Sequence, residues 1–170
     1  MRKFLCGLLA GVAVVALIAF TYVRFGFFDP RADIPVNRLE QEIAMPSLDA
    51  SIKRHAVHTG SVDGDDGDLI AGMKLYQANC ASCHGDVDHP HGALADALYP
   101  RAPQFLKEVP DMTEDENFYI IQHGIRLSGM PAWKPLFNDH QIWQITAFLS
   151  HIDKLPVDVS TQWKAEATTD

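Results

Sequence analysis

The stretch DLIAGMKLYQANCASCHG, residues 68–85, places two cysteines, separated by two residues, directly before a histidine. Upstream of the cysteines, apolar residues recur at helical spacing behind Asp68, whose carboxylate can accept an amide hydrogen bond at a helix start. This pattern predicts a helix over residues 68–80 that ends in the turn CASCHG. The two thiols and the imidazole are therefore expected together at the end of one helix.

Cys80, Cys83 and His84 form a CxxCH motif, which is the attachment signature of a c-type haem. Two thiols at this spacing reach both vinyl groups of one porphyrin, and the adjacent imidazole reaches the iron. A structural zinc site needs two further ligands, and the chain has no other cysteine outside its apolar N-terminal stretch. A thioredoxin-like disulfide pair is disfavoured because the sequence shows no convincing strand pattern. We therefore predict one haem c, bound covalently by Cys80 and Cys83, with His84 as an axial iron ligand.

The second axial ligand must come from another part of the chain. The candidates are methionines and histidines: Met73, Met112, Met130, His89, His91, His123 and His140. Met130 is favoured because Gly129 lets the backbone approach a porphyrin and Pro131 stiffens the loop. Met73 lies on the first helix and is interpreted as a core residue. A thioether ligand raises the reduction potential and closes the iron to substrates, which predicts electron transfer.

Two further helices are predicted after the motif. Thr113 and Glu116 form a capping box that opens a helix over residues 113–123. Asn138 or Asp139 opens the last main helix, which runs to residue 153 with its apolar residues largely on one face. The predicted fold class is therefore all-α.

These motifs together resemble the class I cytochromes c over residues 68–155, in particular the membrane-anchored monohaem type found in bacteria. The resemblance implies the class I cytochrome c fold, with three main helices around a covalent haem. In that family the first and last helices cross at a glycine and an aromatic residue. Gly72 and Tyr76 match this pattern against Phe148, with Trp143 one turn earlier.

The resemblance also implies roles for residues around the haem. The family has a proline whose carbonyl accepts a hydrogen bond from the axial histidine, and Pro103 is the matching position, with Pro100 as the alternative. Arg126 could neutralise a haem propionate and Trp133 could donate its indole hydrogen to one; surface exposure and core packing explain these two residues equally well. The long proline-rich loop 86–110 departs from the compact mitochondrial pattern, so contacts with partners are not transferred from the family. Its start could bind a second metal, but a solvated loop is the favoured interpretation.

Residues 4–23 contain no charge and, as a helix at about 1.5 Å per residue, span roughly 30 Å, one thickness of membrane hydrocarbon. We predict a single membrane-spanning anchor. A cleaved signal peptide is the alternative, disfavoured by the length of the run and the lack of a small-x-small cleavage site. Because Arg2 and Lys3 precede the helix without acidic neighbours, the positive-inside rule places the haem domain on the periplasmic side of a bacterial inner membrane.

The predicted organisation has four parts: an anchor over 1–23, a linker over 24–67, a cytochrome domain over 68–155 and a flexible tail over 156–170. Three prolines punctuate the linker, and a short helix from Ser47 to His55 is expected within it, after Pro46.

The chain of 170 residues carries a formal net charge of −8, which disfavours nucleic acid as a partner. Arg2 and Lys3 are the only charges before residue 24, so the rest of the chain carries −10. This acidity predicts redox partners with a basic docking surface. The predicted function is a tethered carrier of single electrons between respiratory partners. Two alternatives remain open: a haem-bearing subunit of an oxidase or dehydrogenase complex, and a ligand-binding haem sensor or enzyme in which Met130 is labile.

Overall fold

The computed structural model describes residues 1–58 and 60–167, and within these ranges it contains helices and no strand. The elements in chain order are α1 (Arg2–Arg24), α2 (Arg38–His55), α3 (Asp66–Asn79), α4 (Ala81–His84), the 3₁₀ helix η1 (Ala95–Ala97), α5 (Glu114–His123), α6 (Asp139–Ser150) and α7 (Val157–Ala167). They fall into two compact units, Met1–Arg31 and Ala32–Asp170. The predicted all-α fold is confirmed.

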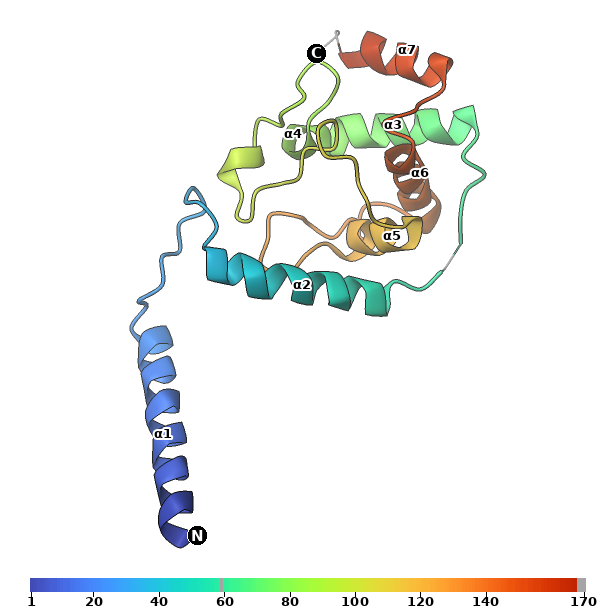
Figure 1. The fold of residues 1–170 in the computed structure, drawn as a ribbon. Coiled ribbons are helices and arrows are strands. Elements are labelled where there is room, and N and C mark those ends of the chain that lie inside the picture. The colour runs from blue at the N-terminus through green and yellow to red at the C-terminus, as the bar shows by residue number, and fades with distance from the viewer. Residues whose placement is uncertain (59, 168–170) are drawn as a thin grey trace. The chain divides into compact units, whose positions relative to one another are not determined.

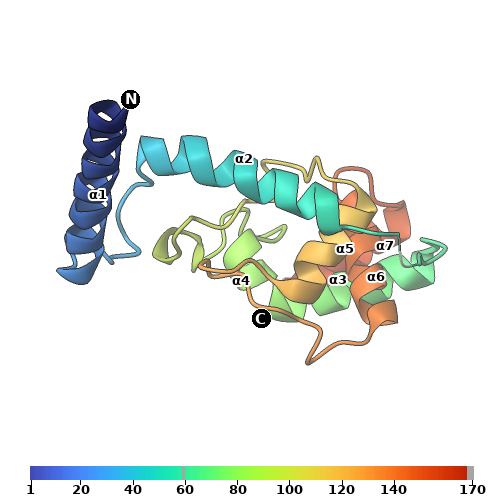
Figure 2. The ribbon, with the colours of Figure 1, turned by 90° about the horizontal axis from the view of Figure 1, so that it is seen from below.

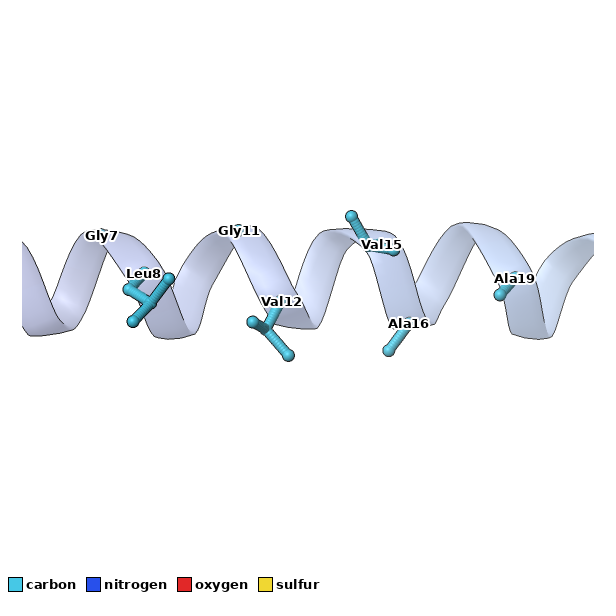
Figure 3. A pocket seen from close by; sticks show the side chains of 7 residues that line it. All are labelled: Gly7, Leu8, Gly11, Val12, Val15, Ala16 and Ala19. Carbon is cyan, nitrogen blue, oxygen red and sulfur yellow. The ribbon is translucent and has the colours of Figure 1, made fainter.

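The first unit consists mainly of α1, which contains the uncharged stretch 4–23. None of its side chains is buried, and the helix is long and apolar enough to cross a membrane. Figure 3 shows a stretch of α1 that carries small residues among larger apolar ones: Gly7, Leu8, Gly11, Val12, Val15, Ala16 and Ala19. This composition suits a lipid environment, because no side chain in the stretch has a polar group to solvate.

The second unit is built on the crossing of α3 and α6. A Cβ atom on Gly72 of α3 would lie 2.0 Å from the backbone oxygen of Gln144 in α6, so only glycine allows this approach. One turn later Tyr76 packs against Phe148, with ring centroids 5.4 Å apart. Both side chains are fully buried. The predicted crossing of the first and last main helices at these residues is confirmed.

The third main helix, α5, packs on α6. It begins at the predicted capping box, in which the Thr113 hydroxyl accepts the amide hydrogen of Glu116 and the Glu116 carboxylate accepts that of Thr113. Phe118 of α5 stacks on Trp143 of α6, with ring centroids 4.3 Å apart. Met73 is completely buried in the same core, as predicted. The three main helices therefore share one hydrophobic core.

The helix in the linker is longer than predicted. The prediction begins it at Ser47 because a proline normally ends helical structure, whereas α2 begins at Arg38 and continues through Pro46. The side chain of Asn37 caps its start. The first half of α2 is exposed, so water can bond the carbonyl that Pro46 leaves without a helical partner. The helix runs alongside α5 (Figures 1 and 2), and Ile52 near its end is buried.

The prediction of a flexible tail over 156–170 is wrong for the residues that the structure describes. Residues 157–167 form α7, while 168–170 lie outside the described part of the chain. Val159 and Trp163 are 0% and 2% exposed. Trp163 packs edge-on against Tyr76 and Phe148. The helix α7 lies beside α3 (Figure 1). Val159 and Trp163 are one turn apart, and two large buried positions in a short helix of mixed composition are too few to give a periodic signal.

Two predicted helix boundaries also differ. The cap of α3 is Asp65, whose Oδ1 accepts the amide hydrogen of Asp68 at 2.9 Å, so the helix begins at Asp66. The helix α6 has Asn138 as its cap and ends at Ser150, three residues before its predicted end. Neither change moves the core positions of α3 or α6.

Candidate functional site

Cys80 and Cys83 lie at the junction of two helices. Cys80 is at once the C-cap of α3 and the N-cap of the single-turn helix α4. The amides of Cys83 and His84 both donate to the backbone oxygen of Cys80, at 3.0 and 2.9 Å. One helical turn therefore brings the two cysteines to the same side, next to His84.

Both cysteines are free thiols. Burial raises the pKa of the Cys80 thiol to about 12, and the neighbouring Cys83 adds to the rise. Such a thiol is neutral near pH 7, whereas a reactive CxxC pair works through a thiolate. The raised pKa therefore disfavours Cys80 as a nucleophile in disulfide exchange.

The orientation of His84 is set by a single hydrogen bond. Its side chain is almost fully buried, and its Nδ1 lies 2.9 Å from the backbone oxygen of Pro103. Because a carbonyl oxygen only accepts, Nδ1 carries the hydrogen and Nε2 keeps a lone pair for a metal. Burial lowers the pKa of His84, against the opposing effect of the bond to Pro103, and this favours the neutral, metal-binding form. The ring also stacks on Phe105, with centroids 4.4 Å apart and planes 4° apart. The partner is Pro103 and not the alternative, Pro100.

The loop 86–110 contains a site residue that sequence reasoning missed. Gln104 is buried, and its Nε2 donates to the backbone oxygens of Cys83 and Ala102 at 3.0 and 2.8 Å. Its Oε1 accepts the amide hydrogen of Gly92 at 2.7 Å. A Cβ atom on Gly92 would lie 2.5 Å from the Cys83 oxygen, so the loop lies directly against the attachment turn. No local signal marks Gln104, because Gly92 and Cys83 are 12 and 21 residues away from it.

The loop that carries Met130 is held by its own hydrogen bonds. Ser128 Oγ accepts the amide hydrogen of Met130 at 3.1 Å and donates to the backbone oxygen of Ile125 at 2.8 Å. The amide of Ile125 donates to the Met130 oxygen at 3.1 Å. A Cβ atom on Gly129 would lie 2.5 Å from a Leu98 methyl group, so this glycine lets the Met130 loop approach the loop 86–110. Met130 itself is partly buried against the core.

Trp133 contributes a buried polar atom that no described residue satisfies. Its ring stacks on Phe137 at 5.2 Å, and its indole Nε1 is buried without a hydrogen-bond partner. An unpaired buried N–H costs roughly 1–3 kcal/mol, so this position fits an acceptor supplied by a bound group. A haem propionate is such an acceptor. Arg126 lies exposed on the loop before Met130.

The remaining candidate ligands lie outside this arrangement. His89 and His91 are exposed, and they lie beside Asp86 and Asp96 at 3.6 and 2.9 Å. His123 and His140 are exposed as well. Among residues 1–58 and 60–167, no group of three or more His, Cys, Asp or Glu is arranged to hold a separate metal ion. The solvated-loop interpretation of the start of the loop is wrong for Asp86, which is 9% exposed.

The segment from α3 to α6 is similar to a known protein family. Residues 67–149 match the family model described as cytochrome c oxidase, cbb3-type, subunit III. Cytochrome c6 of Synechococcus elongatus is 31% identical over 85 residues, which are 48% of this chain and 87% of that protein. Cytochrome c6 of Thermosynechococcus vestitus is also 31% identical over 85 residues, which are 68% of its length.

One solved structure, the reducing HAO-like protein complex of Kuenenia stuttgartiensis, aligns at a TM-score of 0.42 with 17% identity. The alignment covers 67% of this chain and 60% of that chain. A likeness at this level is too distant to support a functional inference.

The chain belongs to the class I c-type cytochromes. Proteins of this family bind haem c covalently, and Cys80 and Cys83 with His84 form the CxxCH motif of this chain. The general function is therefore electron transfer, either as a carrier or as the haem subunit of a complex.

Proposed function

We propose that this protein is a membrane-tethered, single-haem cytochrome c that passes single electrons between respiratory partners, with His84 and Met130 as axial ligands. The observation that carries the proposal is the geometry of His84. Its Nδ1–H is bonded to the Pro103 carbonyl, which leaves Nε2 for the metal, directly after the cysteine pair. When bound, haem c supplies an iron that takes up and releases one electron.

The residues on the histidine side have separate tasks. Cys80 and Cys83 would hold the porphyrin through thioethers, which would prevent it from leaving. The carbonyl of Pro103 fixes the tautomer of His84 and makes its Nε2 a stronger donor to the metal. Stacking on Phe105 restrains rotation of the imidazole ring. A ligand held in this way needs little rearrangement when the charge of the site changes.

Met130 is the proposed second ligand, and the hydrogen bonds of its backbone amide and oxygen to Ser128 and Ile125 would hold its loop in place. A thioether is a soft ligand that favours the reduced iron. If His84 and Met130 both bound the iron, no position would remain for a substrate, which favours electron transfer over catalysis. Trp133 is proposed to donate its indole hydrogen to a propionate, and Arg126 to offset propionate charge from the surface.

The helix α1 is proposed to tether the haem domain to the periplasmic face of the inner membrane. Its uncharged length and the positive charges of Arg2 and Lys3 support this orientation. A tether restricts the domain to a plane and raises its effective concentration near membrane-bound partners.

The acidity of the haem domain supports a partner with a basic docking surface. Attraction between exposed charges is screened by salt over about 8–10 Å at physiological ionic strength. Electron exchange with the physiological donor should therefore slow as salt is raised. A rate of electron exchange that does not change with ionic strength would contradict the basic docking surface.

A fixed subunit of a larger complex is a second candidate, because the matched family model describes an oxidase subunit. Purification in mild detergent separates the two. A free carrier elutes alone, whereas a subunit co-migrates with stoichiometric partners.

The experiment that tests the proposed function is a reduced-minus-oxidised absorption spectrum with a redox titration on the detergent-purified, full-length protein. We expect one covalent haem per chain, a low-spin spectrum in both oxidation states and a one-electron titration. A high-spin wild-type spectrum would show an open iron and would favour the ligand-binding alternative.

A further inference from the structure

A buried carboxylate lies beside the haem attachment turn, and the proposed function gives it no role. Asp86 follows His84 by two residues, and its side chain is only 13% exposed. Two residues of chain span at most about 7 Å, so the backbone of Asp86 is held close to that of the axial histidine.

Both carboxylate oxygens of Asp86 accept hydrogen bonds. Its Oδ1 accepts the amide hydrogens of Asp88 and His89, at 2.9 and 2.6 Å. Its Oδ2 accepts from Nε2 of Gln77 at 3.3 Å. Both oxygens therefore accept hydrogen bonds from N–H groups, which fixes the position of the side chain.

The C-terminal helix α7 fixes the orientation of the Gln77 side-chain amide. The indole of Trp163 donates to Oε1 of Gln77 at 2.9 Å. Because an indole N–H can only donate, Gln77 must present its oxygen to Trp163 and its amide hydrogens to Asp86. Trp163 is almost fully buried, and its hydrogen bond to Gln77 is partly buried. The helix lies beyond the residues that match the family model, 67–149.

The charge of Asp86 is balanced mainly by the hydrogen bonds that its carboxylate accepts. Among the described residues, its one ion-pair partner is His89, 3.6 Å away and 79% exposed. The charge also acts on the buried core. Burial raises the pKa of the Tyr76 hydroxyl, and Cys80 and Asp86 both add to the rise. Tyr76 itself donates to the backbone oxygen of Gly85, between His84 and Asp86.

We infer that the Asp86 carboxylate, which accepts a hydrogen bond from Gln77 at Oδ2, lowers the reduction potential of the haem. The inference rests on the proposed function. Oxidised iron carries one more positive charge than reduced iron, so a fixed negative charge nearby stabilises the oxidised form. Since the carboxylate is buried, its field is weakened less by water and salt than that of a surface charge.

The sign of the effect separates this role from a merely structural one. Loss of the charge should raise the reduction potential. Loosening of the turn without loss of charge would let water reach the haem, and water stabilises the more highly charged oxidised form. A structural defect should therefore lower the potential or leave it unchanged.

The test is a redox titration of the full-length holoprotein in detergent for wild type, Asp86→Asn, Asp88→Asn and Trp163→Phe. Asp88 is the matched control, because the same charge is removed at an exposed position two residues away. We expect D86N to raise the midpoint potential clearly, D88N to raise it much less, and the shift of D86N to persist at high salt. W163F keeps the charge and should not raise the potential.

Equal shifts for D86N and D88N, or an unchanged or lower potential for D86N, would overturn the inference. D86N places an amide donor against Gln77, so Asp86→Ser provides a second neutral variant without that clash, and it should shift the potential in the same direction. The absorption spectrum keeps the two proposals apart. A high-spin wild type contradicts the proposed function, whereas low-spin variants with an unmoved potential contradict only the role of Asp86.

Discussion

The tautomer of His84 and the orientation of Gln104 are both set by backbone oxygens, which can only accept hydrogen bonds. Pro103 fixes the first, and Cys83 and Ala102 fix the second. In each case a buried polar side chain has one arrangement that satisfies its donors and acceptors. The attachment turn is therefore held in one geometry before any bound group contributes to it.

Trp133 is the residue whose buried polar atom still needs a partner, and this leads to a prediction. Replacement by phenylalanine keeps a ring against Phe137 and removes the indole N–H. If that N–H donates to a propionate, W133F should lower the free energy of unfolding of the holoprotein by about 1.5–3 kcal/mol, the range for a hydrogen bond to a charged group. Denaturant titration measures this. A neutral or stabilised variant would show that the N–H has no acceptor.

At the scale of elements, the sequence predicts the helices that carry strong local signals. The capping box of Thr113 and Glu116 and the approach of α3 to α6 at Gly72 are both found. The first half of α2 and the whole of α7 are missed. Local propensity opposes a helix through Pro46, and the anchoring of Trp163 depends on contacts with residues far away in the chain.

The crossing of α3 and α6 gives a prediction with a matched control in the same helix. Gly72→Ala would place a Cβ atom 2.0 Å from the Gln144 oxygen, a backbone atom that cannot turn away. We expect the helices to separate and the unfolding free energy to fall by at least about 2 kcal/mol. Gly67→Ala, near the exposed start of α3, meets only the end of the Asp65 side chain and should change stability by less than about 1 kcal/mol. Equal losses of unfolding free energy in the two variants would contradict the close packing of α3 on α6 at Gly72.

The helix α7 gives the second prediction at this scale. Trp163→Ala removes a buried ring from Tyr76 and Phe148 and should cost about 3–5 kcal/mol, as for other buried aromatic residues. Val157→Ala, at a position that is 78% exposed in the same helix, serves as the control and should have little effect. Thermal unfolding, monitored by absorption, distinguishes the two variants. A W163A variant as stable as V157A would contradict the packing of α7 and would support the sequence prediction of a flexible tail.

At the scale of the whole molecule, the chain divides into α1 and a haem domain that has its own core. A chain that begins at Ala32 should therefore fold, bind haem and give the spectrum of the full-length protein. It should also be recovered from the aqueous fraction, whereas the full-length protein should remain with membranes until detergent is added. A full-length protein that is found in the aqueous fraction would contradict the tether.

The site was predictable where chemistry is encoded locally and was missed where it depends on tertiary contacts. Cys80, Cys83 and His84 are adjacent in the chain, so their spacing alone indicates covalent haem. Gln104 and the pair of Gln77 and Trp163 act through hydrogen bonds across up to 86 residues, which no sequence window reports. These contacts exist only once α3, the loop 86–110 and α7 have come together.

The most direct test of the account is the absorption spectrum of the oxidised protein for wild type, Met130→Ala and Met112→Ala. With His84 and Met130 as axial ligands, wild type and M112A should be low-spin and show the charge-transfer band of an iron–thioether bond. M130A should lose that band and become high-spin or bind added ligands. A wild-type spectrum without the band, or an M130A spectrum that retains it, would contradict the central claim.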